Sequence, residues 1–177
     1  MFRSHGVATV SSDELVHDLL DTEPVLSKIE ERWGSGVVTE GRVDRAAVGS
    51  RVFSDRAELE WLEALVHPLV RREIASWVEN LDGGVAVVEV PLLFESELHD
   101  RFDTTIAIVA DESVRIERAG ARGHSGLEGR EERQLSQAEK AARADHVIVN
   151  DGTVEQLETA LLGLLDELGI ELPPQPG

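Results

Sequence analysis

One carboxylate, Asp13, stands where a predicted strand gives way to a predicted helix. Residues 7–10 favour a short strand, and Ser11 and Glu14 have the spacing of a capping box for a helix that runs to about Leu20. In the first turn of that helix, Asp13 could accept a proton from a substrate hydroxyl as a general base. It could also do no more than interact favourably with the helix dipole, so the position alone leaves both interpretations open.

Basic side chains gather in one stretch of an acidic chain. The formal net charge is −18, yet seven of the 17 basic residues lie between positions 115 and 143. Arg115, Arg118 and Arg122 have the i, i+3, i+7 spacing of one helix face, and Arg130 and Arg133 follow. Arginines beside a strand end can close over phosphates and neutralise a transferring phosphoryl group. A solvated helix face has the same spacing, so both interpretations stay open.

Two further motifs have a structural and a functional interpretation. His67 precedes Pro68, which suits either a helix cap or a functional histidine. Asn150, Asp151 and Gly152 follow a predicted strand, and these residue types suit either a simple turn or a loop that binds a base.

Strands must position these groups. Residues 85–90 and 104–109 are short runs rich in β-branched residues, and a third run spans 146–149. Such runs between helices predict an α/β fold with a parallel sheet covered on both faces. Ligands of these sheets bind beyond the carboxyl ends of the strands, where residues 89–95 project. Glu89, unusual in an apolar strand, is either a solvated acid or part of a site.

Residues 24–81 predict four successive helices and no strand. Asp44 and Ser54 are expected to cap the second and third helices, and Pro68 to begin the fourth. The segment therefore has the pattern of a helical subdomain inserted between sheet strands.

The C-terminal part of the chain predicts one long amphipathic helix. Thr153 and Gln156 have capping-box spacing. The helix has one apolar stripe, made of Val154, Leu157, Leu161, Leu164, Leu165 and Leu168. Glycines at every third position from 120 to 129 predict a mobile segment, and residues 173–177 a disordered tail.

The bulk properties exclude several classes of protein. The chain has 177 residues and no cysteine, so it suits one domain without disulfides or thiolate metal sites. No signal peptide or membrane-spanning run is present, and the acidic balance argues against nucleic-acid and membrane partners. We expect a cytoplasmic protein, and we assign no metal-ligating residues.

Four segments in their order and spacing resemble the dephospho-CoA kinase family, the P-loop kinases that perform the last step of coenzyme A biosynthesis. They are residues 41–53, 65–69, 90–95 and 140–152, and the similarity extends from about Gly6 to Leu168. The resemblance implies a three-layer α/β fold with a parallel sheet over residues 1–172. It also implies an acceptor-binding helical insertion at 24–81 and a lid at 120–135.

The implied reaction transfers the γ-phosphoryl group of ATP, with Mg²⁺, to the ribose 3′-hydroxyl of dephospho-CoA. Asp13 matches the second acid of the family's Asp-Ala-Asp motif, and Ser11 replaces the first. The resemblance implies catalytic roles for Asp13, Arg122 and Arg130. It implies acceptor binding by Arg45, His67, Pro91, Leu92, Leu93 and Glu95. It implies nucleotide binding by Arg133, Asn150, Asp151 and Gly152.

The family's phosphate-binding loop has the pattern Gly-x-x-x-x-Gly-Lys-Ser/Thr, which does not occur in these 177 residues. By the family pattern, a first strand and this loop, roughly 20 residues, would precede Met1. The alternative is a non-catalytic relative that keeps the acceptor pocket but cannot hold ATP. An in-frame glycine-rich loop upstream of Met1 would favour the enzyme, and an in-frame stop codon the relative.

Overall fold

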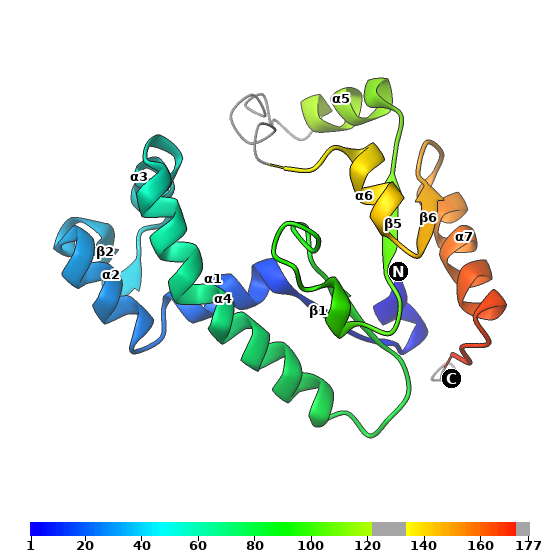
Figure 1. Ribbon diagram of the computed structural model, residues 1–177, viewed down its shortest axis with the longest axis horizontal. Coiled ribbons are helices and arrows are strands. Elements are labelled where there is room, and N and C mark those ends of the chain that lie inside the picture. Colours follow the sequence, from blue (N-terminus) through cyan, green and yellow to red (C-terminus); the bar gives the residue numbers. More distant parts are fainter. Residues whose placement is uncertain (122–133, 173–177) are drawn as a thin grey trace. The chain divides into compact units, whose positions relative to one another are not determined.

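The computed structural model describes residues 1–121 and 134–172, which form two compact units. Residues 2–91 make the N-terminal unit, coloured blue to green in Figure 1, and residues 92–172 make the C-terminal unit, coloured green to red. No described helix is long and apolar enough to cross a membrane. The expectation of one domain over residues 1–172 stays a prediction.

The N-terminal unit combines a parallel strand pair with helices. Its elements are η1 (Phe2–His5), β1 (Ala8–Ser11), α1 (Ser12–Leu20), α2 (Val25–Trp33), η2 (Ser35–Val37), β2 (Val38–Thr39), β3 (Arg42–Val43), α3 (Arg45–Ser54), α4 (Arg56–Glu79) and β4 (Ala86–Glu89). β1 pairs in parallel with β4, with Ala8 opposite Ala86 and Ser11 opposite Glu89. The two carboxyl ends therefore lie side by side.

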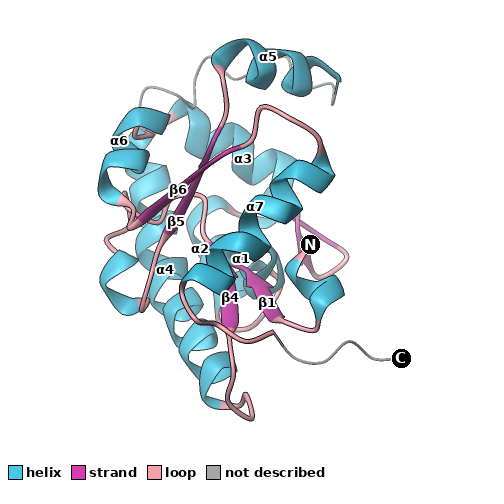
Figure 2. Ribbon diagram, turned by 90° about the vertical axis from the view of Figure 1, so that its right-hand side faces the viewer, coloured by secondary structure: helices cyan, strands magenta, loops and turns pink. Residues whose placement is uncertain are grey.

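The C-terminal unit holds a second parallel pair. Its elements are η3 (His99–Arg101), β5 (Ile106–Val109), α5 (Glu112–Ala121), α6 (Gln137–Arg143), β6 (His146–Val149) and α7 (Val154–Glu167). β5 and β6, both labelled in Figure 2, pair in parallel from Ile106 opposite His146 to Val109 opposite Val149. The α/β class with parallel strands is confirmed, although the described strands form separate two-stranded sheets rather than one continuous sheet.

The predicted helix break at His67 and Pro68 is wrong, because α4 continues through both residues. Pro68 lacks an N–H, so the helix loses one hydrogen bond at a cost of about 3 kcal/mol. The same helix buries Val66, Val70 and Ile74, and each buried side chain of this kind contributes roughly 1.5–3 kcal/mol. Burial therefore outweighs the cost of the proline.

Two other local predictions for residues 24–81 also need correction. Asp55, not Ser54, caps α4 by accepting a hydrogen bond from the Ala57 N–H, whereas the predicted Asp44 cap of α3 is confirmed. The segment also contains a short antiparallel hairpin of β2 and β3. Glu40 and Gly41 form its two-residue turn with φ of 53° and 74°, as the favoured hairpin turns require.

One apolar core joins the helices of the N-terminal unit. It consists of Leu20, Val25, Ile29, Trp33, Val37, Val43, Val48, Val52 and Val66. A second cluster packs Leu19 of α1 against Val70 and Ile74 of α4, with Val88 of β4 beside it. This cluster fixes the helix that carries Asp13 against both the long helix and the strand pair.

Helix α7 follows the predicted pattern. Thr153 and Gln156 form the capping box, and Leu157, Leu161 and Leu165 are buried. Val154 at the first end of the predicted stripe is 64% exposed, so the stripe is shorter than its sequence pattern.

Glu58 connects α4 to α2 through three donors. Its carboxylate accepts hydrogen bonds from Arg32 Nε at 2.6 Å, Arg32 Nη2 at 3.1 Å and Trp33 Nε1 at 2.7 Å. The Arg32 guanidinium lies 4.8 Å from the centre of the Trp61 ring, which meets Trp33 edge to face at 5.1 Å. Arg32, and then Trp33, lower the pKa of Glu58 below its usual value.

We expect Glu58→Gln to lower the melting temperature at neutral pH, with a difference from wild type that shrinks on acidification. A carboxylate whose folded pKa is depressed stabilises the protein above its unfolded pKa, near 4.5, and loses this contribution as the pH falls below it. Thermal melts between pH 7 and pH 3 measure the difference. Glu31→Gln, which removes an exposed acid next to Arg32 in helix α2, is the control. A constant difference across this range would contradict the assigned role.

Candidate functional site

Asp13 lies where the sequence predicted it, in the first turn of α1 directly after β1. It is exposed, and the residue before it, Ser12, is buried. Because Ser11 pairs with Glu89, Asp13 stands at the carboxyl edge of the β1–β4 pair. The predicted capping box is not formed, since Ser11 is the last residue of β1 and its side chain makes no capping hydrogen bond. Asp13 therefore lies in the first turn of a helix that has no side-chain cap from Ser11.

The other end of α1 is tied to Arg45 through Asp21. The Asp21 carboxylate accepts a hydrogen bond from the Val43 N–H at 2.9 Å and from Arg42 Nε at 3.0 Å. Arg45 Nη2 lies 3.9 Å from Asp21 Oδ2 and donates to the His17 carbonyl at 3.5 Å. The Val43 N–H is the main cause that lowers the pKa of Asp21. Arg45, 44% exposed, therefore sits at a fixed corner between α1 and α3.

His67 lies inside α4 and is half-buried rather than a helix cap. Burial is the main cause that lowers the pKa of its imidazole; Glu63 opposes this shift and Arg71 adds to it. The side chain therefore favours the neutral form, which can donate or accept a hydrogen bond.

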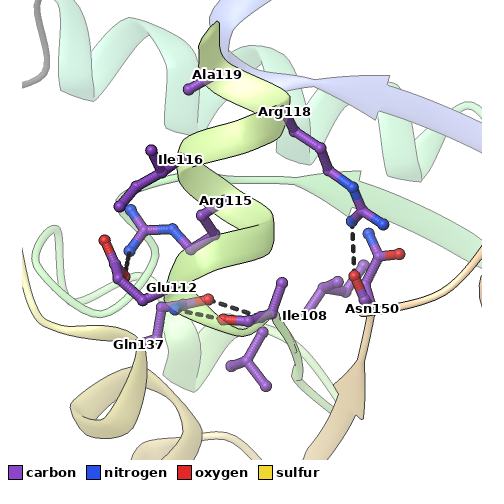
Figure 3. A pocket seen from close by; sticks show the side chains of 10 residues that line it. Ile108, Glu112, Arg115, Ile116, Arg118, Ala119, Gln137 and Asn150 are labelled. Carbon is purple, nitrogen blue, oxygen red and sulfur yellow. Dashed lines mark hydrogen bonds and ion pairs between the residues drawn. The ribbon is translucent and has the colours of Figure 1, made fainter. Parts of the chain in front are cut away.

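A pocket of about 340 Å³ opens at the carboxyl end of β5 (Figure 3). Its lining comprises Ile108, Val109, Ala110, Glu112, Arg115, Ile116, Arg118, Ala119, Gln137 and Asn150. Ile108 and Ile116 leave apolar surface open, with exposed fractions of 50% and 63%. Apolar walls with a few polar groups are typical of sites for small organic ligands.

Arg118 holds the loop of Asn150 and Gly152 against α5. Its Nη1 donates to the Asn150 carbonyl at 2.6 Å and its Nη2 to the Gly152 carbonyl at 2.7 Å. From the other side, Asp151 Oδ1 accepts a hydrogen bond from the Asp111 N–H at 2.6 Å. In Figure 3 the Asn150 side chain lies beside the Arg118 guanidinium at the pocket edge. The predicted loop is thus brought to the pocket, and Asp151 supports its backbone.

Close packing explains why position 152 is a glycine. A Cβ at this position would collide with the side-chain amide of Gln156. That amide oxygen accepts a hydrogen bond from the Thr153 N–H in the capping box of α7. The glycine therefore allows the loop and the helix cap to coexist.

Gln137 fixes the backbone at the other side of the pocket. Its amide oxygen accepts from the Ala110 N–H at 2.8 Å, and its amide nitrogen donates to the Ala110 carbonyl at 2.9 Å. Sequence reasoning missed the roles of Gln137 and Arg118. Arg118 belonged to the arginine pattern, which indicated its helix face but not its partners, and Gln137 had no signal at all.

Residues 91–97 form the turn that follows β4. The Leu92 and Leu93 carbonyls accept hydrogen bonds from Ser96 Oγ at 2.7 and 3.3 Å. Glu95 Oε1 accepts from the Leu135 N–H at 2.9 Å and pairs with Lys140 Nζ at 3.1 Å. The Glu95 carboxylate therefore meets groups of the protein itself.

The remaining predicted residues are divided between regions. Pro91 ends the N-terminal unit, which also holds Asp13, Arg45 and His67. Arg122, Arg130 and Arg133, with most of the predicted lid at 120–135, lie outside the described residues. Within the described ranges no three His, Asp or Glu side chains gather as a metal site.

A sequence model of the family described as "Dephospho-CoA kinase" matches residues 1–156. The chain belongs to the dephospho-CoA kinase family. A dephospho-CoA kinase of Protochlamydia amoebophila is 34% identical over 174 residues, which cover 93% of this chain and 86% of the relative. This membership confirms the resemblance seen in the sequence and the expected class of enzyme, a kinase.

Solved structures agree with this assignment. A crystal structure of a Thermus thermophilus protein has a TM-score of 0.79 and 36% identity, covering 94% of this chain and 87% of that chain. A dephospho-CoA kinase from Campylobacter jejuni has a TM-score of 0.70 and 26% identity with the same coverage. Both match nearly the whole chain, so the likeness includes both compact units.

We expect Arg118→Lys to loosen the loop at Asn150 while keeping the charge, because an ammonium group cannot donate to both carbonyls in the same geometry. Losing a charged hydrogen bond costs about 1.5–3 kcal/mol, so the amides of Asn150 and Thr153 should exchange roughly tenfold faster or more. Hydrogen exchange followed by NMR measures this. Arg143→Lys is the control, and equal exchange in both variants would refute the role of Arg118.

Proposed function

We propose that this protein transfers the γ-phosphoryl group of ATP to the ribose 3′-hydroxyl of dephospho-CoA. The family match over residues 1–156 is the observation that carries this proposal. The exposed carboxylate of Asp13 at the strand edge supports it, because phosphoryl transfer to an alcohol needs a group that accepts the hydroxyl proton.

In the proposed reaction the oxygen of the 3′-hydroxyl attacks the γ-phosphorus, and Asp13 accepts the proton of that hydroxyl. The bond between that phosphorus and the bridging oxygen breaks, and ADP leaves with the electron pair. Charge on the transferring group would be neutralised by Arg122 and Arg130, whose roles stay proposals from the family pattern.

The adenine moiety of ATP is assigned to the pocket beside β5. The open apolar side chains of Ile108 and Ile116 suit the faces of a base. The Asn150 amide offers a donor and an acceptor at the rim, and Arg133 is proposed to bind phosphate. Asp151 and Gly152 contribute by shaping the loop.

Arg45, His67 and the turn beginning with Pro91, Leu92 and Leu93 are proposed to bind the acceptor. Arg45 offers a guanidinium that is 44% exposed to an anionic ligand. The half-buried His67 is proposed to contribute a neutral hydrogen-bonding group.

Mg²⁺, which the family implies, fits this chemistry as an ion that the ATP phosphates carry, because Mg²⁺ takes few protein ligands. The described residues contain no cluster that would hold it alone, and we assign no residue to it. The cytoplasmic location and the lack of nucleic-acid and membrane partners also stay predictions.

A second candidate function is binding of dephospho-CoA without transfer. It is favoured by one observation, the lack of Gly-x-x-x-x-Gly-Lys-Ser/Thr in the 177 residues. The backbone N–H groups and the lysine of that loop cradle the phosphates, and positioning with charge neutralisation supplies most of the catalysis in this reaction class.

We therefore expect the 177 residues alone to bind dephospho-CoA but to form no detectable CoA. Calorimetry with dephospho-CoA and a coupled assay for ADP measure the two steps, and the product of the native gene is measured in parallel. CoA formation by the gene product, stoichiometric with ADP, supports the kinase. Binding without product in both samples supports the second candidate. Rapid turnover by the 177 residues would contradict our expectation that they lack a phosphate cradle.

The role of Asp13 is tested by Asp13→Asn in the native gene product. Loss of a positioned general base should lower turnover by roughly 10²-fold or more, while dephospho-CoA affinity changes little. If Asp13 serves only the helix dipole, the variant should lose about 0.3–1 kcal/mol of stability and keep its turnover. Asp18→Asn, at an exposed position of the same helix, is the matched control. Full activity of the Asp13→Asn variant would exclude Asp13 as the base.

A further inference from the structure

Glu95 is enclosed by protein groups rather than open to a ligand. Its side chain is 15% exposed, and Oε1 meets two donors, the Leu135 N–H at 2.9 Å and Lys140 Nζ at 3.1 Å. Lys140 is 23% exposed, so water screens this pair less than a surface ion pair.

The second carboxylate oxygen of Glu95 supports the same view. Oε2 is buried and has no hydrogen-bond partner among the described residues. A buried carboxylate is costly unless a charge compensates it, and Lys140 supplies that charge. A ligand rich in phosphate would repel this carboxylate, so Glu95 is poorly suited to contact the anionic part of dephospho-CoA.

Both partners of Glu95 lie in α6 or immediately before it. Lys140 is part of α6, and Leu135 directly precedes Ser136, which forms the capping box of α6 with Glu139. The first residue of this helix is Gln137, which lines the pocket and holds the Ala110 backbone. Glu95 therefore joins the turn after β4 to the helix that builds one wall of the pocket.

We propose that Glu95 is a positioning residue for the nucleotide pocket, acting through Leu135, Lys140 and the start of α6. Its carboxylate sets the place of Gln137, and with it the backbone at the carboxyl end of β5. The turn at 91–97 and the pocket are then coupled. A ligand that reorders the turn therefore changes the affinity of the pocket for the nucleotide. The assignment of a nucleotide to this pocket rests on the proposed function.

Glu95→Gln tests the proposal because it keeps the shape and removes the charge. We expect ATP affinity to fall about fivefold or more, and the Leu135 amide to exchange about tenfold faster or more. Lys140→Met removes the partner of Glu95 and should also lower ATP affinity. Lys140→Arg keeps the positive charge and should keep ATP affinity near that of the wild type. Glu60→Gln, which breaks the exposed Arg56–Glu60 pair, is the control and should change neither quantity.

The double variant Glu95→Lys with Lys140→Glu separates the two contacts. It restores opposite charges but no acceptor for the Leu135 N–H, so this amide should still exchange fast. If Glu95 instead contacts the acceptor, Glu95→Gln should weaken dephospho-CoA binding and leave ATP affinity and Leu135 exchange unchanged, which would overturn the proposal. These measurements use the native gene product, and lack of ATP binding by its wild-type form would refute the pocket's assigned ligand. An unchanged Leu135 amide would refute the positioning role by itself.

Discussion

Parallel pairing of β1 with β4 and of β5 with β6 decides where the polar candidates of this chain stand. Both strands of a parallel pair end at the same edge, so residues far apart in the sequence meet there. Ser11 and Glu89 are brought together in the N-terminal unit by this pairing, and Val109 and Val149 in the C-terminal unit. Asp13 closely follows β1 and the loop at 150–152 follows β6, so the strand register positions both candidate sites.

Charged side chains hold the segments beyond the strand ends, and many of their partners are backbone groups. Asp21 and Asp151 accept hydrogen bonds from backbone N–H groups of distant segments, and Arg118 donates hydrogen bonds to two loop carbonyls. Such charge-assisted hydrogen bonds are stronger than neutral ones and leave loops with few alternative conformations. The same residue types that suggest catalysis in a sequence thus also build the frame around a site.

An acidic protein that binds anionic ligands must keep its own carboxylates away from them or pair those carboxylates with basic groups. Near the pocket, Glu112 pairs with Arg115 at 2.7 Å and Glu95 with Lys140 at 3.1 Å. These local pairs offset two acidic charges in the C-terminal unit, while the formal charge of the whole chain remains −18. The basic stretch from 115 to 143 is therefore divided between structural pairing, as with Arg118, and the arginines proposed to meet phosphates.

The sequence by itself determined the parallel strands, the Asp44 cap, the capping box of α7 and the family, because these depend on local residue patterns and on the order of motifs. It also placed Asp13 after a strand. Tertiary structure decided the continuous α4, where burial of Val66, Val70 and Ile74 outweighs a proline that local rules treat as a break. It also decided the partners of Glu95 and Asp151, each of which bonds to a residue 40 positions away. Residue types indicate that a carboxylate is present, but only the packing of distant elements determines whether it meets a substrate, a lysine or a backbone N–H.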